Sequence, residues 1–447
     1  MAHAHTTTYL ALGIVACFAG VGCGSRSIGS DYSEAGGANQ SRVCHLESNW
    51  ERRFSGEPGL LLDQGVLGPE GPVLAGRHFQ DFAESTAVLG FSLSGAERFR
   101  RRLDGRSPKL AQVAHGTALA RSLKNDLVVS LHAADGSTSA EAHLGSEDED
   151  SAHVVAPAAD GFLVVSTAAH YPSSLGDVQA TRFSANGSHL WQQTWKTQQK
   201  LELRVIGAFA DAKGNAVVAI HRWLNGGHGP VWLVALHPNG HMRWQYTDSV
   251  HLTRGAVQVL LQTSSGGAVV VGSIDDGSGV AGGPARALHL NASGDVVWAR
   301  SFDDGSGNQQ LVSDGIQLSD GSFAFIGYSA NSAQGRLWRV RADGTVAWAR
   351  DYAEVGAGLA KVRALPGGGF VVGAARWSLT SEDLYEVVQL DAEGEILRRH
   401  RADGEGVAQL GALDVDAAGR VLAVGWWSKD QARQSHVMLL SEVCSVD

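Results

Sequence analysis

The stretch ALHPNGHMRWQY (residues 235–246) predicts a β-hairpin in which an Asn-Gly turn joins two strands and a tryptophan lies in the second strand. Variants of this hairpin recur downstream as LHLNASGDVVWAR, RVRADGTVAWAR and QLDAEGEILRRH. The turn glycine supplies the positive φ that a tight turn needs, and the tryptophan supplies a large apolar anchor against a neighbouring unit. The hairpin is therefore a repeated structural element and not a chemical motif.

The spacing of these hairpins defines the length of the repeat. The residue four positions after each turn glycine recurs at intervals of 41 to 54 residues. A second phrase, a glycine turn followed by an apolar strand as in GGAVVVGS (residues 266–273), recurs with the first. Four antiparallel strands in about 50 residues, repeated along the chain, are the signature of a β-propeller blade.

The two ends of the chain predict how the ring closes. The last unit contains three strands, and the missing strand is CHLESNWERRFSG (residues 44–56) near the N-terminus. We therefore expect the N-terminal strand to complete the last blade, which removes the exposed sheet edges. The outer strands are then marked by eight positions: Trp50, Phe99, Ala140, Trp191, Trp244, Trp298, Trp348 and Arg398.

These markers predict a single all-β, eight-bladed β-propeller over residues 44–447. The segment at about 108–145 is short and has Ala140 in place of the tryptophan. If that segment is not a blade, the ring has seven blades.

The composition limits the class of partner. The chain has 447 residues, of which 18% are charged and 56 are glycine, and its net charge is −10. Phosphate contacts supply most nucleic-acid affinity, so an acidic chain without extended basic patches is not expected to bind nucleic acid. The Arg-rich run at 98–106 is expected to be the solvated face of an outer strand.

The N-terminal residues predict export and anchoring. The apolar run YLALGIVACFAGVGC (residues 9–23) is too short for a membrane span and suits a signal peptide. It ends at Cys23 and is followed by a Gly/Ser-rich stretch, as in a bacterial lipoprotein. We therefore expect residues 1–23 to be a signal, Cys23 to be lipidated and residues 24–43 to be a tether.

The four cysteines help to choose the modified residue. Lipidation at Cys23 leaves Cys44 and Cys444 as an even pair, which we expect to form a disulfide where the ring closes. The alternative lipidation site is Cys17, because IVAC fits the lipobox better, although it leaves a very short apolar region. A second alternative is an ordinary cleaved signal and a soluble secreted protein. The expected location is the cell envelope, at the outer membrane, with contact to the membrane only through the lipid.

The repeat resembles known families. The GG-aromatic-VV-x-G and LxxDG-x-x-W phrases resemble the blades of secreted bacterial β-propellers over roughly residues 44–443. The phrases LDAEGEIL and LHLNASGDVVW are similar to the repeat of quinoprotein propellers, which also occurs in the eight-bladed lipoprotein of the outer-membrane β-barrel assembly machine. The resemblance implies an envelope propeller. Quinoprotein enzymes carry adjacent cysteines, which this chain lacks, so we expect no cofactor.

One face of the propeller is expected to bind a ligand. In a four-stranded meander, the second loop lies on the face opposite the first and third turns, and here the second loops are long and divergent, as in AAHYPSSLGD and RWSLTSED. Exposed aromatic and Arg side chains suit carbohydrate stacking or protein recognition. The alternative, that these side chains pack between blades, stays open. The residues gathered on this face are His78, Phe79, His170, Tyr171, His221, Arg222, Trp223, Tyr328, Arg376, Trp377, Trp426 and Trp427.

A second group of residues is expected to line the axial channel. They give a mixed, mildly basic surface of a kind that admits a small anion: His153, Arg204, Arg254, Asp314, Lys361 and Arg363.

The resulting hypothesis is a non-catalytic, envelope-anchored monomer that binds a protein or glycan through its long-loop face. The alternative is a secreted enzyme acting on polysaccharide, of the lyase or glycosidase type, which would need converging acid and base groups. Asp314 has no clear carboxylate partner in the sequence, and we predict no catalytic, cofactor or metal residues.

Overall fold

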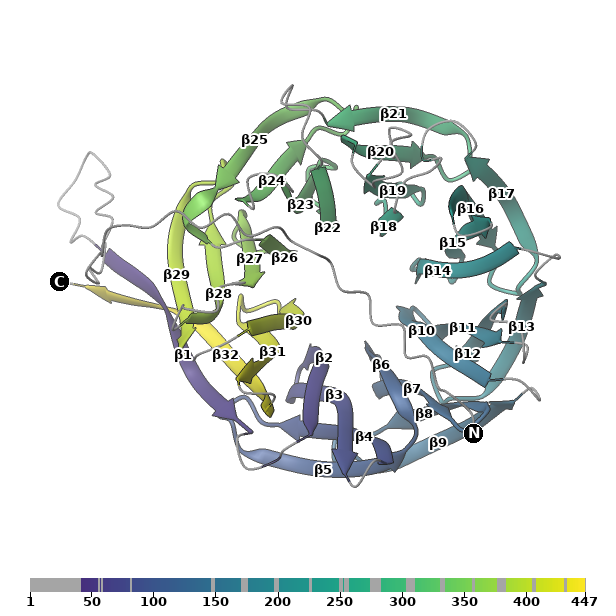
Figure 1. Cartoon of the computed structure of the whole chain (residues 1–447), viewed down its shortest axis with the longest axis horizontal. Helices are drawn as coiled ribbons and strands as arrows, with labels where there is room; N and C mark the ends of the chain where they lie inside the picture. The colour runs from purple at the N-terminus through teal and green to yellow at the C-terminus, as the bar shows by residue number, and fades with distance from the viewer. Residues whose placement is uncertain are drawn as a thin grey trace, which may run out of the picture. The chain divides into compact units, whose positions relative to one another are not determined.

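The computed structural model forms a ring of eight four-stranded antiparallel sheets (Figure 1). It describes residues 42–54, 57, 59–80, 83–145, 149–169, 176–196, 201–224, 227–248, 252, 257–273, 283–302, 310–329, 334–355, 358–375, 383–403, 407–429 and 432–446. At several strand ends only the backbone is described. The prediction of an all-β, eight-bladed propeller is confirmed.

Each blade runs from an inner strand at the channel to an outer strand at the rim. Blade 1 contains β2 (Leu60–Gly68), β3 (Gly71–Gln80), β4 (Ala83–Phe91) and β5 (Glu97–Asp104), and blade 2 contains β6 (Arg106–Val113), β7 (Gly116–Leu123), β8 (Asp126–His132) and β9 (Thr138–Gly145). Blade 3 contains β10 (Glu149–Ala158), β11 (Gly161–Ala169), β12 (Gly176–Ser184) and β13 (His189–Trp195), and blade 4 contains β14 (Leu201–Ala210), β15 (Ala216–Leu224), β16 (Gly227–Leu236) and β17 (Met242–Asp248).

The second half of the ring repeats this order. Blade 5 contains β18 (Val257–Gln262), β19 (Ala268–Ser273), β20 (Ala285–Leu290) and β21 (Val296–Phe302), and blade 6 contains β22 (Gln310–Gln317), β23 (Phe323–Ser329), β24 (Gln334–Val340) and β25 (Val346–Tyr352). Blade 7 contains β26 (Gly358–Ala364), β27 (Phe370–Ala375), β28 (Asp383–Leu390) and β29 (Ile396–Asp403), and blade 8 contains β30 (Val407–Val415), β31 (Val421–Lys429), β32 (Ala432–Val446) and β1 (Arg42–Arg53). Blade 2 is complete without a tryptophan in β9, so the seven-bladed alternative is wrong.

The N-terminal strand closes the ring as predicted. Blade 8 has the order β1-β32-β31-β30, so strands from the two ends of the chain lie side by side (Figure 1). The Phe54 amide donates to the Ser435 carbonyl at 3.0 Å. The Glu51 carboxylate lies 2.7 Å from Nε2 of the buried His436, and this hydrogen bond lowers the pKa of Glu51 to about 2. The closure therefore combines backbone pairing with a polar contact between β1 and β32.

The hairpin at residues 235–246 shows how neighbouring blades meet. The Trp191 indole in β13 donates to the Pro238 carbonyl of the next blade at 2.6 Å. A Cβ on Gly240 would lie 2.8 Å from the Trp191 ring, and Gly240 has a φ of +85°. The outer-strand aromatic of one blade therefore packs on the turn glycine of the next, and glycine is needed both for its φ and for this close approach.

The same contact recurs at the next seams, where it can be tested. Gly294 has a φ of +87°, and a Cβ there would lie 2.7 Å from the Trp244 ring, whereas Gly419 has a φ of +78° and nothing within 4 Å. Gly419→Ala should cost about 1 kcal/mol through backbone strain alone. Gly294→Ala should cost about 2–4 kcal/mol because it adds a clash in a packed seam. Urea unfolding of both variants measures the difference, and equal losses would show that the aromatic contact is unimportant.

The seam between blades 7 and 8 differs, because β32 and β1 are not joined by a turn. The position of the tryptophan is occupied by Arg398, whose Nη2 lies 2.8 Å from the Glu442 carboxylate of β32. A side-chain ion pair therefore occupies the position at which Trp50, Trp191, Trp244 and Trp298 donate an indole hydrogen bond to a turn carbonyl. This accounts for the arginine in the last copy of the repeat.

A β-bulge interrupts every inner strand, a feature that the sequence did not predict. The register shifts lie at Leu62/Gln64, Arg106/Lys109, Ala152/Val154, Val205/Gly207, Val257/Val259, Val312/Asp314, Leu359/Lys361 and Leu410/Ala412. At one bulge, the Ser313 hydroxyl donates to the Leu359 carbonyl of the next blade at 2.5 Å. Bulges bend strands and increase their twist, and here they bring adjacent inner strands into contact around the channel.

Among the described residues, the single helical element is the short 3₁₀ turn η1 (Ala353–Val355). None of these residues belongs to a helix with the length and apolar character of a membrane-spanning segment.

Candidate functional site

The second hairpin of a blade is the one that joins its second and third strands. In blades 1, 4 and 8 this hairpin consists of extended strands with a short tip, and not of the long loop expected from the sequence. Arg77, His78 and Phe79 belong to β3, and His221 to Trp223 belong to β15. Trp426 and Trp427 belong to β31, which remains paired with β32 up to Lys429. The expectation of long loops is wrong for these blades, because cross-strand pairing continues almost to the hairpin tip.

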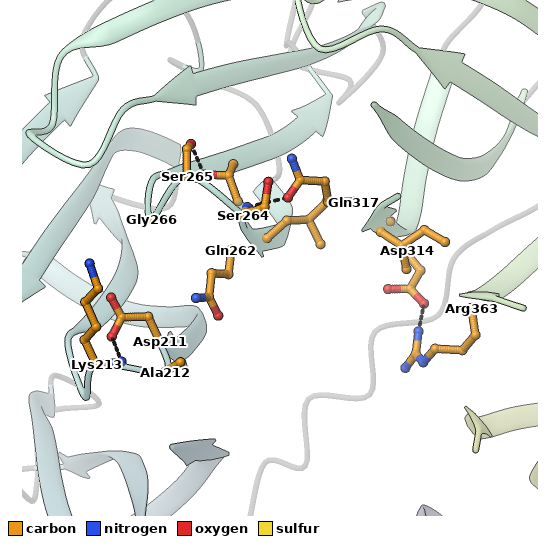
Figure 2. Close-up of a pocket in the computed structure, with 14 residues that line it drawn as sticks. Asp211, Ala212, Lys213, Gln262, Ser264, Ser265, Gly266, Asp314, Gln317 and Arg363 are labelled. Carbon is orange, nitrogen blue, oxygen red and sulfur yellow. Dashed lines mark hydrogen bonds and ion pairs between the residues drawn. The ribbon is translucent and has the colours of Figure 1, made fainter. Parts of the chain in front are cut away.

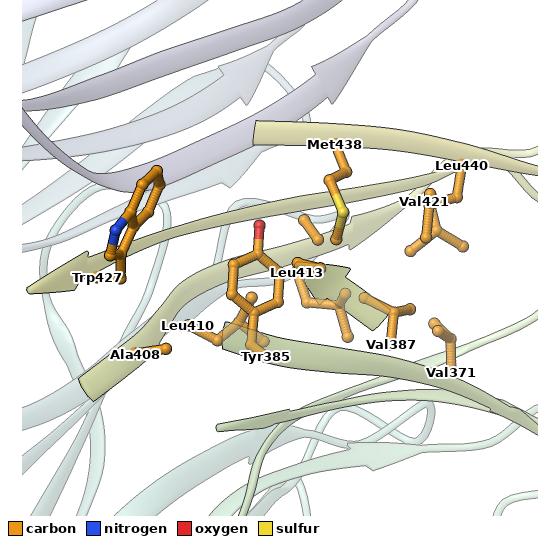
Figure 3. Close-up of a cluster of buried hydrophobic side chains, with 12 residues drawn as sticks. Val371, Tyr385, Val387, Ala408, Leu410, Leu413, Val421, Trp427, Met438 and Leu440 are labelled. Atoms are coloured by element: carbon orange, nitrogen blue, oxygen red, sulfur yellow. The ribbon is translucent and has the colours of Figure 1, made fainter. Parts of the chain in front are cut away.

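Trp427 is a core residue of the seam between blades 7 and 8. Its side chain is 8% exposed and belongs to a cluster with Tyr385, Leu410 and Met438 (Figure 3). The ring of His436 lies edge-on to Trp427 with a centroid distance of 6.1 Å. Packing between blades, the alternative left open by the sequence, therefore describes this residue, and we remove Trp427 from the candidate face.

Other members of the candidate face remain accessible. Phe79 is 39% exposed, and the Arg77 guanidinium lies 5.8 Å from its ring centroid. Trp426 is half-buried under the guanidinium of Arg433 at 5.3 Å. Arginine over an aromatic ring is thus a recurring arrangement at the ends of the second hairpins.

His78, Tyr328 and His221 are less exposed members. Burial and the nearby Arg102 lower the pKa of the half-buried His78, while burial raises the pKa of Tyr328. His221 is buried, and its Nε2 lies 2.9 Å from the Gly229 carbonyl. These three side chains contribute more to packing than to an accessible surface.

Several predicted residues cannot be placed. His170, Tyr171, Arg254, Arg376 and Trp377 lie outside the described residues, as do Cys17 and Cys23. The backbones of Trp223, Cys44 and Cys444 are described but their side chains are not. The Cys44–Cys444 disulfide stays a prediction, although both cysteines lie in the paired strands β1 and β32.

Two tryptophans that the sequence did not predict, Trp195 and Trp232, cluster with the predicted Arg222 at the rim of blades 3 and 4. The Arg222 guanidinium lies 4.7 Å from the Trp232 ring centroid, and the Trp195 ring meets Trp232 edge-on at 6.1 Å. All three side chains are half-buried. We call Trp195, Arg222 and Trp232 the rim patch.

The strand pattern contained the signal for this cluster. Trp195 follows Trp191 by four residues in β13, so the period of two places both on the strand face that meets blade 4. Trp195 ends β13 and Arg222 lies near the end of β15, which places the rim patch on the face of the second hairpins and interblade connections.

The axial channel contains two predicted residues that the structure brings together. The Arg363 guanidinium donates to the Asp314 carboxylate at 2.9 Å, and the Val362 amide donates to the same oxygen at 3.1 Å. Both residues line a pocket of about 710 Å³ at the channel mouth (Figure 2). Asp314 is thus paired with a cation from the next blade and not with a second carboxylate.

The remaining channel residues are dispersed. His153 is the bulge residue of β10, and burial, helped by the charge of Lys109, lowers its pKa to about 4. Arg204 is exposed and Lys361 is half-buried on other inner strands. Within the described part of the chain, no three His, Cys, Asp or Glu side chains are grouped to hold a metal ion.

Comparison with known proteins finds no family for this chain. No family model matches the chain, and no curated protein matches its sequence. The WD40 domain of SCAP from fission yeast is similar in structure, with 9% identity and a TM-score of 0.49, over 88% of this chain and 98% of that one.

Part of each of two larger enzymes is also similar in structure to this chain. Puromycin hydrolase has 17% identity and a TM-score of 0.44 over 72% of this chain and 51% of that one. Prolyl oligopeptidase B from Galerina marginata has 8% identity and a TM-score of 0.49 over 83% of this chain and 56% of that one. The chain spans about half the length of these two enzymes. At these identities and TM-scores the likeness carries no argument about function.

Proposed function

We propose that the protein is an envelope-anchored binding propeller that recognises a partner protein through the rim patch. The observation that carries the proposal is the group formed by Arg222, Trp232 and Trp195, with spacings of 4.7 and 6.1 Å. Hot spots of protein interfaces are enriched in tryptophan and arginine. A closed ring of eight blades provides a rigid scaffold for these side chains.

A glycan is the second type of partner expected from the sequence. Sugar rings stack on an open aromatic face, but the guanidinium of Arg222 covers one face of Trp232. The Trp232 indole is further held by a hydrogen bond of 3.3 Å to Gln245. This arrangement favours a protein partner. A polysaccharide-cleaving enzyme would need paired acid and base groups, and the Asp314–Arg363 pair does not supply them.

The rim patch can be tested by affinity capture from detergent-solubilised envelope. Trp232→Ala and Trp195→Ala should each weaken capture of the partner by at least tenfold, because hot-spot truncations cost about 2 kcal/mol or more. Met242→Ala is the matched control, since Met242 is 56% exposed on β17 of the same blade. Thermal melts should show all three variants folded. Equal capture by the Trp variants and the control would refute the patch, and capture of glycan alone would refute the choice of a protein.

The proposed anchoring rests on the N-terminal sequence. The apolar run ends at Cys23, the following residues are rich in Gly and Ser, and modification of Cys23 leaves an even pair of cysteines. The similarity of the hairpin phrases to quinoprotein-type repeats and to the lipoprotein of the β-barrel assembly machine supports the same location. By that likeness the partner would be another envelope protein.

Cys23→Ser should abolish lipid attachment and release the protein from the membrane fraction. Metabolic labelling with an alkynyl fatty acid measures the attachment directly, and Cys17→Ser is the matched control. Unchanged labelling of Cys23→Ser with loss of labelling in Cys17→Ser would assign the lipid to the other cysteine. An unlabelled, soluble wild type would refute anchoring.

A further inference from the structure

The channel-mouth pocket lies on the opposite face from the rim patch. It is lined by the first turns of blades 4 and 5 and by the inner strands β18, β22 and β26, and its volume is about 710 Å³ (Figure 2). Figure 2 shows Asp211 and Lys213 on one side, Asp314 and Arg363 on the other, and Gln262 between them. The volume is within the usual range for small-molecule sites, roughly 300–1,000 Å³.

The acceptor groups of this pocket are already engaged. Asp211 caps its own turn by accepting the Lys213 and Asn215 amides, both at 2.8 Å, and the Asn215 side chain at 2.7 Å. Asp314 accepts the Val362 amide and Arg363. The side-chain oxygen of Gln317 accepts the Ser264 amide at 2.5 Å. These bonds fix the walls of the pocket and leave few acceptors for a ligand.

The donor groups, in contrast, have unused capacity. Arg363 uses Nη1 for Asp314 and for the Val362 carbonyl, while its Nε and Nη2 have no partner among the residues that the structure describes. The Lys213 ammonium and the Gln262 carboxamide likewise have no partner there. Nε and Nη2 together form the fork that binds a carboxylate through two parallel hydrogen bonds. Because Asp314 holds the other end of the guanidinium, the fork is preorganised.

From this geometry we propose that the pocket binds the C-terminal carboxylate of a short peptide, with Arg363 as the carboxylate receptor. Gln262 provides both a donor and an acceptor, as a peptide bond requires. Leu261 and Ile316 supply an apolar wall for an aliphatic side chain. Among the residues that the structure describes, no aromatic side chain lines this pocket, so a sugar acid would lack a stacking surface there.

The test uses saturation-transfer NMR with three probes: N-acetyl-Gly-Ala-Leu with a free carboxylate, its carboxamide and trigalacturonate. The free acid should bind about tenfold more tightly than the carboxamide, because the charge-assisted pair is lost in the amide. Arg363→Lys keeps a cation beside Asp314 but removes the fork, and it should weaken the free acid by about tenfold. Arg341→Gln is the matched control, since Arg341 is an exposed cation on the third turn of blade 6, on the same face.

The binding pattern of the three probes shows whether the pocket is a receptor for a peptide carboxylate. Preference for the free acid that disappears in Arg363→Lys and persists in Arg341→Gln supports it. Equal binding of acid and amide, no binding of either, or binding unaffected by Arg363→Lys overturns it. Binding of trigalacturonate without the peptide acid overturns the choice of a peptide. The rim patch is not involved, so its variants should leave this binding unchanged.

Discussion

A chain shortened to begin at Ser55 is expected not to form a stable monomer. The deletion removes β1 and with it Leu46, Trp50 and Phe54. The side chains of Leu46 and Phe54 are buried, with exposed fractions of 7% and 4%. Truncation of one buried Phe or Trp to Ala alone costs about 3–5 kcal/mol. Losing the whole strand should exceed the total stability of a typical domain, about 5–15 kcal/mol. The loss also exposes the edge of β32, which invites aggregation.

The control for this deletion is a chain that begins at Arg42 and keeps β1. Both chains can be compared by size-exclusion chromatography and thermal unfolding. The control should be monomeric and melt cooperatively, whereas the shorter chain should aggregate or lack a melting transition. A shorter chain that is monomeric and melts like the control would contradict closure by β1.

Trp427→Ala should destabilise the protein by about 3–5 kcal/mol, since the substitution leaves a large cavity between blades 7 and 8. The indole belongs to the same buried cluster as Tyr385 and Met438 (Figure 3), and its ring lies edge-on to that of His436. Trp426→Ala is the matched control, because Trp426 is the adjacent residue and is only half-buried beneath Arg433. Its loss should cost about 1 kcal/mol. Urea unfolding measures both, and a Trp427→Ala variant as stable as Trp426→Ala would place Trp427 outside the core.

The architecture could be predicted from the sequence because the same packing contact recurs at most seams. A glycine with positive φ is followed four positions later by an aromatic residue, as Gly240 and Trp244 or Gly294 and Trp298 show. Apolar strands such as β19 are buried on both faces and mark the centre of each blade. The ring closure followed from counting strands at the two ends.

The bulges and the surface could not be predicted in the same way. The bulge residues Asp63, His153, Ser313 and Gly411 share no side-chain type, so no pattern marks them. Whether Trp427 faced solvent or the seam depended on how far β31 and β32 stay paired. The rim patch joins β13 to β15 and β16 across two blades, and that proximity exists only in three dimensions.

Photo-crosslinking in intact cells shows directly whether the rim patch contacts a partner protein. A photoreactive phenylalanine analogue replaces Trp232 in one variant and the exposed Met242 of the same blade in another. We expect a discrete protein adduct on irradiation of the Trp232 variant and none with the Met242 variant. No adduct at position 232, or the same adducts at both positions, would contradict it.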